Sequence, residues 1–156
     1  MTPTQTLTKA AASYLLKYRY SAFVELGLTE GGSLRADVIG LKINGEILCC
    51  EVKSSWADFN QDKKWQKYLI HCNKMVFVFP EWLWLKYKDR ILEKIQSEKV
   101  GVLILCPKTG YLKSVRSTSR RKMQGSYKKN IVLRMAYRSG DYRFGPNRRQ
   151  RYFLEK

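Results

Sequence analysis

The alternation of apolar and polar positions divides the chain into short strands and amphipathic helices. Apolar residues recur at helical spacing over residues 4–23, which predicts a helix there. Residue Glu25 follows, and TEGGS (29–33) has the composition of a loop. Two apolar, β-branched runs flank Asn44-Gly45, so RADVIGLKINGEILCCEVK (35–53) predicts a β-hairpin. The remaining expected elements are a helix over 54–72, a strand over 74–79, a helix over 81–98 and a strand over 100–106.

This order of elements predicts an α/β domain with a mixed sheet and helices on both faces. Ser55 and Asp58 match a helix-capping pattern at the start of the helix over 54–72. After Pro107 the pattern is weaker: GYLKSV (110–115) fits an edge strand, and SYKKNIVLRMAYR (126–138) fits either a helix or a strand. We therefore expect a core over residues 1–107 and a basic C-terminal extension over 108–156, either part of the same domain or a flexible tail.

The composition is that of a folded chain, with 156 residues, 44% of them hydrophobic and 13% aromatic. No apolar run is long enough to span a bilayer, and the first residues lack the apolar segment of a signal peptide. We expect a cytoplasmic protein of a bacterial or phage-infected cell, without a membrane partner.

The four cysteines are Cys49, Cys50, Cys72 and Cys106, each in an apolar context. Cys49 and Cys50 are adjacent on a predicted strand and so point to opposite faces, which suits neither a disulfide between them nor a zinc site. Buried free thiols in a reducing compartment are expected.

The net charge of +17 is unevenly distributed along the chain. Residues 1–107 hold 15 Lys/Arg against 11 Asp/Glu, whereas residues 108–156 hold 15 against 2. Such an excess favours an anionic partner, and nucleic acid is the leading candidate. The aromatic residues interleaved with these cations either stack on bases or pack into the core. The charge identifies a class of partner and no chemistry.

The register of the hairpin decides which side chains meet at its open end. Glu51 and Lys53 share a face because they are two residues apart on one strand. A two-residue turn at Asn44-Gly45 would place Asp37 on the other face from Glu51. A three-residue loop with Gly45 in the left-handed conformation, or a bulge at Gly40, sets Asp37 opposite Glu51. We favour the three-residue loop, since it also sets Lys42 opposite Glu46.

Two carboxylates about 5 Å apart at the backbone repel each other unless a cation lies between them. Mg²⁺ takes one or two carboxylates, several waters and a phosphate oxygen, so this strand end suits it; Mn²⁺ is a possible substitute. A divalent ion there would activate a water and neutralise charge on a scissile phosphate, with Lys53 assisting. A simple ion pair at the strand's exit is the alternative for Glu51 and Lys53 taken alone.

Asp37 followed by Glu51-Val52-Lys53, on a hairpin between two helices, resembles the PD-(D/E)XK nuclease superfamily. The stretch from Arg35 to Pro80 is similar to the MmcB-type DNA-repair branch, a Holliday-junction-resolvase-like group. In that branch a helix of the form D-F-x-x-D-x-K-W-x-x-Y follows the E-V-K strand, and here it begins at Asp58. The resemblance covers about residues 20–106 and implies a restriction-endonuclease-like fold.

The resemblance also implies roles for individual residues. Asp37 and Glu51 would be metal ligands, with the Val52 carbonyl as a third, and Lys53 would be the catalytic lysine. Glu25 is the candidate for the additional acidic residue that many members carry near the first helix. The residue before Asp37 is Ala36, where many members have proline.

Asp58 and Asp62 fall on the inner face of the predicted helix and call for partners. Either they stabilise the helix N-terminus, or they orient Lys53 and metal-bound waters from a second layer; capping is favoured for Asp58. We expect the sole histidine, His71, to have a structural and not a catalytic role. The cations expected to bind nucleic acid are Lys64, Arg116, Arg120, Arg121, Lys122, Lys128, Lys129, Arg148, Arg149 and Arg151.

The expected function is that of a Mg²⁺-dependent DNA endonuclease in repair or recombination, as a structure-specific or resolvase-like enzyme. Resolvase-like members are homodimers, so dimerisation is expected as well. The rivals are a non-catalytic nucleic-acid-binding protein that retains the nuclease fold, and a structural RNA-binding protein.

Overall fold

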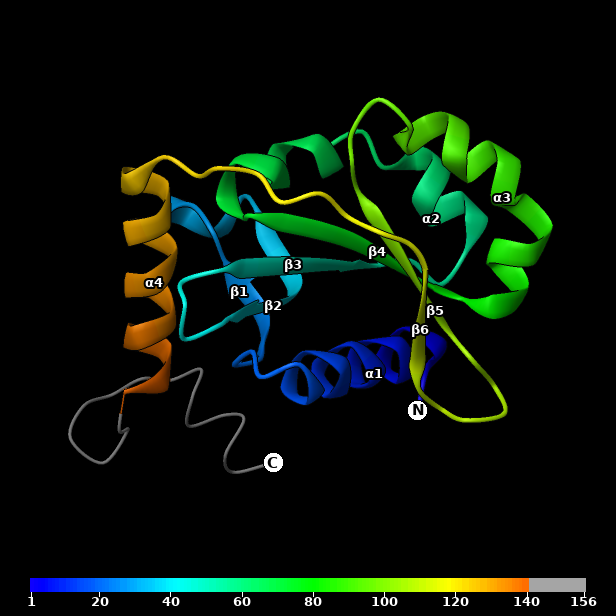
Figure 1. Cartoon of the computed structure of the whole chain (residues 1–156), viewed down its shortest axis with the longest axis horizontal. Coiled ribbons are helices and arrows are strands. Elements are labelled where there is room, and N and C mark those ends of the chain that lie inside the picture. Colours follow the sequence, from blue (N-terminus) through cyan, green and yellow to red (C-terminus); the bar gives the residue numbers. More distant parts are fainter. Residues whose placement is uncertain (141–156) are drawn as a thin grey trace.

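The computed structural model describes residues 1–140, and they form one six-stranded sheet flanked by helices (Figure 1). The elements in chain order are α1 (Pro3–Lys17), β1 (Phe23–Gly27), η1 (Glu30–Gly32), β2 (Arg35–Leu41), β3 (Ile47–Val52), α2 (Trp56–Gln61), η2 (Trp65–His71), β4 (Lys74–Pro80), α3 (Glu81–Ile95), β5 (Gly101–Leu105), β6 (Leu112–Arg116) and α4 (Gly125–Ser139).

The strands lie in the order β1-β2-β3-β4-β5-β6. The first three are antiparallel neighbours, β3, β4 and β5 run parallel, and β6 returns antiparallel to β5. The parallel steps are made through α2 with η2 and through α3. The mixed sheet and the α/β class predicted from the sequence are therefore confirmed, and the fold is of the restriction-endonuclease type.

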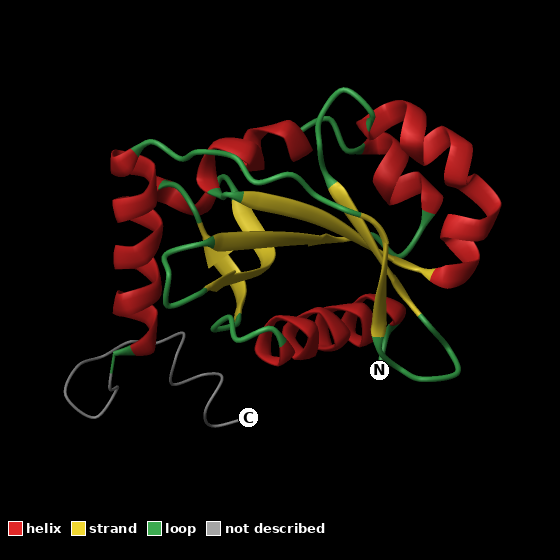
Figure 2. Ribbon diagram, in the orientation of Figure 1, coloured by secondary structure: helices red, strands yellow, loops and turns green. Residues whose placement is uncertain are grey.

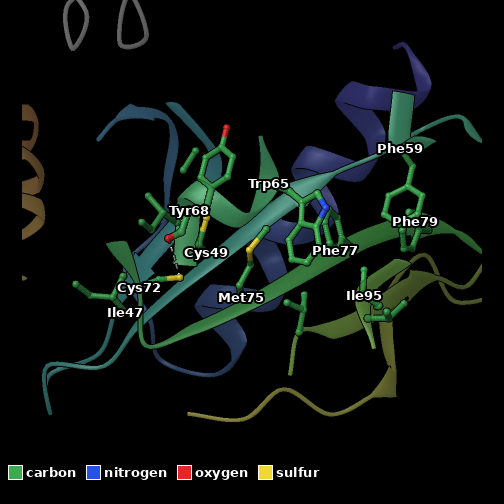
Figure 3. Close-up of a cluster of buried hydrophobic side chains, with 14 of the residues drawn as sticks. Ile47, Cys49, Phe59, Trp65, Tyr68, Cys72, Met75, Phe77, Phe79 and Ile95 are labelled. Atoms are coloured by element: carbon green, nitrogen blue, oxygen red, sulfur yellow. Dashed lines mark hydrogen bonds between the residues drawn. The ribbon is translucent and has the colours of Figure 1, made fainter. Parts of the chain in front are cut away.

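Each face of the sheet carries its own hydrophobic core. Helix α1 covers one face, and α2, η2 and α3 lie over the other (Figure 2). Every residue of β3 is buried, as expected for a strand covered on both sides. Cys49 lies in the larger core, beneath Trp65 and Tyr68 of η2 (Figure 3), whereas Cys50 faces α1. All four cysteines are free, and Cys49, Cys50 and Cys72 are buried as predicted, whereas Cys106, just after β5, is only half-buried.

The N-terminal helix is shorter than the predicted 4–23 and is followed by a strand that the sequence did not reveal. Helix α1 begins with a capping box between Thr2 and Gln5 and ends at Lys17. Arg19 then adopts a left-handed conformation (φ 65°), which ends helical geometry, and the Tyr20 N–H turns back to the Leu15 carbonyl. Glu25 consequently lies within β1.

The single helix predicted over residues 54–72 is also wrong. Ser55 caps α2 by accepting from the Asp58 N–H, as its pattern indicates. The helix stops after six residues because Asp62 takes up an extended conformation, where its carboxylate accepts from the Lys64 N–H. Such local side-chain bonds compete with helical ones. A separate 3₁₀ segment, η2, then carries the chain to β4.

The extension after Pro107 contributes two elements to the described fold. GYLKSV supplies β6, an edge strand as predicted, and residues 125–139 resolve as helix α4. The chain between them crosses from β6 to the far end of the molecule (Figure 1), where α4 lies beside β1. The basic segment over 141–156 lies outside the described residues.

Candidate active site

The hairpin has the three-residue loop that the sequence favours. The Gly45 N–H bonds the Lys42 carbonyl, the Lys42 N–H bonds the Glu46 carbonyl, and Gly45 has a φ of 91°. The β2–β3 register runs unbroken from Leu41↔Ile47 to Val38↔Cys50, so no bulge at Gly40 is needed. Continued by one position, this register sets Asp37 opposite Glu51.

The Asp37 and Glu51 carboxylates meet where the β2–β3 ladder opens. The Asp37 N–H donates to Glu51 Oε1 at 3.2 Å, and the Val52 N–H donates to Asp37 Oδ2 at 2.8 Å. Each carboxylate thus satisfies a backbone group of the facing strand with one oxygen. The two side chains also interact directly, because a hydrogen bond with Glu51 acts to lower the pKa of Asp37.

Burial and mutual repulsion make this pair unfavourable as two anions. Burial, reinforced by the charge of Asp37, raises the pKa of Glu51 well above its usual value. The pKa of Asp37 is also raised, mainly by burial. The hydrogen bond from the Val52 N–H and the positive charge of Lys53 oppose this increase without cancelling it. Strongly perturbed carboxylates of this kind are typical of functional sites. The pair requires either a proton or a cation.

Lys53 is fixed by Asp62 beside these carboxylates. The Lys53 ammonium lies 2.7 Å from Asp62 Oδ2, and both side chains are largely buried. Burial acts to raise the pKa of Asp62, but the hydrogen bond from Lys53 and that from the Lys64 N–H lower it overall. Asp62 reaches Lys53 because it caps the C-terminus of the short α2 helix, and so it does not lie at the N-terminus of that helix. Asp58 is instead exposed in the first turn of α2.

Glu25 lies on β1 across from Asp37 in the β1–β2 register, and its charge contributes to raising the Asp37 pKa. Its φ of 54° is unusual for a residue other than glycine. Its side chain is exposed. Within residues 1–140, no three His, Cys, Asp or Glu side chains form a group that could hold a metal ion. A metal at this site would therefore rest on two carboxylates, and the part assigned to Glu25 stays a prediction.

Two further residues complete the surroundings of the site. The Tyr68 hydroxyl donates to the Arg35 carbonyl at 2.8 Å and so holds the start of β2, two residues before Asp37. Lys94, on α3, donates to the Phe59 carbonyl at the end of α2. Burial and the nearby Lys63 lower the pKa of Lys94, whereas Asp62 acts to raise it. Sequence reasoning missed Lys94, because no pattern shows how α3 is rotated against α2.

The predicted nucleic-acid-binding cations do not gather at the carboxylates. Lys64 is exposed next to Asp62. Lys128 donates to the Gly45 carbonyl at 2.6 Å, and Arg120 lies 3.6 Å from Glu46, both at the hairpin turn. The Arg121 backbone N–H donates to the Asn73 carbonyl. The side-chain oxygen of Asn73 in turn accepts from the N–H of Ile47, at the start of β3.

The other predicted cations are placed as follows. Lys122 and Lys129 are exposed, Arg116 lies at the end of β6, and Arg148, Arg149 and Arg151 lie outside the described residues. The hairpin turn is at the opposite end of β3 from Glu51. The structure therefore separates one group of cations, at the turn, from the lysines around Asp62.

Comparison with known proteins identifies the family. Residues 3–144 match the family described as DNA repair protein MmcB-like. The chain belongs to this family. MmcB-like proteins are part of the PD-(D/E)XK nuclease superfamily, so the resemblance seen in the hairpin and its following helix is confirmed. The assignment gives the protein a place in DNA repair and implies interaction with DNA.

Two solved structures are similar to this one. The SPO1766 protein of unknown function from Silicibacter pomeroyi has a TM-score of 0.72 and 29% identity, over 88% of this chain and 86% of its own. An XisH family protein from Nostoc punctiforme has a TM-score of 0.54 and 16% identity, over 71% of this chain and 99% of its own, and supports the fold alone. No curated protein matches the chain. Among the described residues, no helix is long and apolar enough to cross a membrane.

Proposed function

We propose that this protein is a metal-dependent deoxyribonuclease that acts in DNA repair, cleaving phosphodiester bonds by hydrolysis. The observation that carries the proposal is the convergence of the Asp37 and Glu51 carboxylates beside the Lys53–Asp62 ion pair. Glu51 is buried, Asp37 is half-buried, and the two charges repel each other, which are conditions that favour binding of a divalent cation.

Asp37 and Glu51 would hold Mg²⁺ or Mn²⁺, with the Val52 carbonyl as a third protein ligand. When bound, the ion supplies Lewis-acid stabilisation of the phosphate and lowers the pKa of water in the site. Lys53 stabilises the negative charge that develops on the phosphate, and Asp62 keeps its ammonium in place. A water oxygen bonds to phosphorus, the bond to one ester oxygen breaks, and that oxygen takes up a proton.

The second candidate is a DNA-binding protein that retains the fold without turnover. It is favoured by one observation: residues 1–140 contain no group of three side chains that could hold a metal ion. A single ion on two carboxylates, completed by water and phosphate, is still sufficient for Mg²⁺. The two candidates therefore differ in whether the isolated protein binds a divalent ion at this site.

The test combines metal binding with cleavage. Titration of the protein with Mn²⁺, followed calorimetrically, should show one site that Glu51→Gln removes and Glu30→Gln, an exposed control, leaves intact. Branched, nicked and linear DNA should be cut with Mg²⁺ and not with EDTA, and Glu51→Gln and Lys53→Met should lose cleavage. DNA binding without any Mn²⁺ site and without cleavage would establish the second candidate. The predicted homodimer is tested separately by sedimentation equilibrium.

A further inference from the structure

A polar cavity lies on the face of the sheet opposite the two carboxylates, between the C-terminal end of α1 and strands β3 to β6. Its volume is 170 Å³. Apolar side chains of β3, β4 and β5 form its floor. The side chains around it are basic and aromatic: Tyr14, Tyr18, Tyr20, Lys42, Lys74 and Arg116. Neither the MmcB-like assignment nor the proposed active site accounts for this combination.

The cavity has an excess of positive charge. Glu46, 6% exposed at its edge, lies 3.3 Å from the Lys74 ammonium and 3.6 Å from Arg120, and it accepts from the Tyr20 hydroxyl. Burial acts to raise the pKa of Glu46, but Tyr20 and Lys74 lower it, so the carboxylate is charged at neutral pH. One anion therefore faces the three lining cations and Arg120, and it fixes Lys74 in position.

Arg116 points to a missing acceptor. Its Nη1 is buried and has no hydrogen-bond partner among residues 1–140. Leaving a buried charged donor unsatisfied costs more than leaving a neutral one, and native proteins rarely do so without a reason. Arg116, Lys42 and Lys74 line the same cavity, and a phosphate can accept charge-assisted hydrogen bonds from a guanidinium and from ammonium groups at once.

Aromatic rings lie at the mouth of the cavity. The Tyr14 and Tyr18 rings are 4.6 Å apart between centroids, and Tyr18 is 46% exposed. The Lys42 ammonium lies 4.7 Å from the centroid of the Tyr20 ring. Tyr20 is buried, so Tyr18, with the Lys17 ammonium 5.7 Å from its ring centroid, is the exposed ring of the three. An exposed ring beside a cation can bind an unpaired nucleotide through base stacking and phosphate contact.

We propose that this cavity binds a backbone phosphate of single-stranded DNA, with Tyr18 stacking on the adjacent base. A cavity of 170 Å³ is smaller than the roughly 300–1,000 Å³ that encloses a whole small molecule, so it takes one group of a longer ligand. Stacking requires an unpaired base, which selects a single strand over a duplex. The inference rests on the proposed association with DNA but not on hydrolysis.

The chain offers a matched control for Arg116. Lys113 is on the same strand, β6, and is exposed, but alternation of side chains directs it to the face opposite Ser114 and Arg116. Arg116→Gln and Lys113→Gln therefore remove the same charge from the two faces of one strand. A charge effect of the whole protein would affect both variants equally.

The experiment measures the fluorescence anisotropy of labelled dT12 in EDTA, so that no cleavage occurs. Arg116→Gln should weaken binding about tenfold and lower the salt slope by about 0.7, whereas Lys113→Gln should stay within twofold of the wild type. Tyr18→Leu should weaken the binding of dT12 and leave the affinity for an abasic oligonucleotide of equal length unchanged. Circular dichroism checks that the variants fold, and Lys42→Gln replaces Arg116→Gln if that variant does not.

Equal affinities for Arg116→Gln and Lys113→Gln, or an equal effect of Tyr18→Leu on both oligonucleotides, would overturn the proposal. Arg116-dependent binding that is tighter for U12 than for dT12 would overturn the assignment to DNA. Glu30→Gln, an exposed substitution outside both sites, should bind dT12 as the wild type does. If the protein cuts no DNA but Arg116→Gln still weakens dT12 binding as expected, only the proposed hydrolysis is refuted, and the cavity proposal stands.

Discussion

Lys53 depends on a carboxylate that comes from a different element. Asp62 is in place because α2 ends after Gln61, and Lys94 secures that end by bonding the Phe59 carbonyl. The ammonium is thereby held over the two β-strand acids and not left free to extend into solvent. Residues that orient a reacting group without touching the substrate are often needed nearly as much as the group itself.

Replacing Asp62 by Asn should lower the rate of DNA cleavage about 10- to 100-fold, because Lys53 loses its charged partner while the Asn oxygen still accepts from the Lys64 N–H. Asp58→Asn is the control, since it removes the same charge from an exposed position on the same helix. Single-turnover rates at saturating DNA measure the effect. Equal rates for the two variants would remove Asp62 from the site.

At the scale of elements, the hairpin was predictable and its surroundings were not. Asn44-Gly45 and the Lys42–Glu46 pairing fix the register locally, and the register alone brings Asp37 to Glu51. Strand β1 escaped notice because it is short, carries the exposed Glu25, and follows directly on a helical pattern.

The break in the helix over 54–72 could not be read from periodicity, since the apolar spacing continues through Asp62. Trp65 is buried whether the segment is α-helical or 3₁₀. The Lys53–Asp62 contact joins residues on either side of a helix. It depends on where α2 stops, and so only the folded structure supplies it.

The contact between β2 and the end of α1 requires a glycine. A Cβ at Gly40 would lie 2.2 Å from the Ser21 carbonyl oxygen, which is backbone and cannot move aside. Gly40→Ala should therefore lower the free energy of unfolding by about 1–3 kcal/mol, the usual cost of overpacking. Gly27→Ala, where nothing lies within 4 Å, should be close to neutral. Urea denaturation measures both, and an equal loss would contradict the predicted clash.

Helix α4 contacts η2 through a histidine whose burial favours the neutral form. The His71 ring meets Tyr127 edge-on at 5.4 Å and is buried with Nδ1 unpartnered among the described residues. Burial, and then the charge of Arg134, lower the pKa of His71. Below a pH of about 6.5, His71 takes up a proton in the unfolded chain but resists doing so in the folded state. The free energy of unfolding should therefore decrease as the pH is lowered.

This predicts that the wild type loses more unfolding free energy between pH 8 and pH 5.5 than His71→Phe does. Urea denaturation of both proteins at the two pH values measures the difference. Because the other titrating groups are common to both proteins, comparing the two removes their contribution. Identical pH dependence would show that protonation of His71 does not oppose folding.

At the scale of the whole molecule, most of the positive charge belongs to the described fold. Residues 1–140 hold 25 of the 30 Lys/Arg and 11 of the 13 Asp/Glu. Some of these cations form two groups, one around Asp62 and one at the hairpin turn and Arg116, at opposite ends of a six-residue strand about 20 Å long. Because β3 itself is buried between two layers of helices, DNA that reaches both groups must pass around the sheet from one face to the other.

Deleting residues 145–156 tests how far the C-terminal charge matters. The family match ends at residue 144, and the deleted segment contains four cations and one acid. Each lost phosphate contact lowers the salt slope of duplex binding by about 0.9, so the slope should fall by at most about 3–4. Cleavage at saturating DNA should be unchanged, because Asp37, Glu51 and Lys53 remain. Complete loss of binding would show that the tail, and not the two groups of cations on the fold, is what holds DNA.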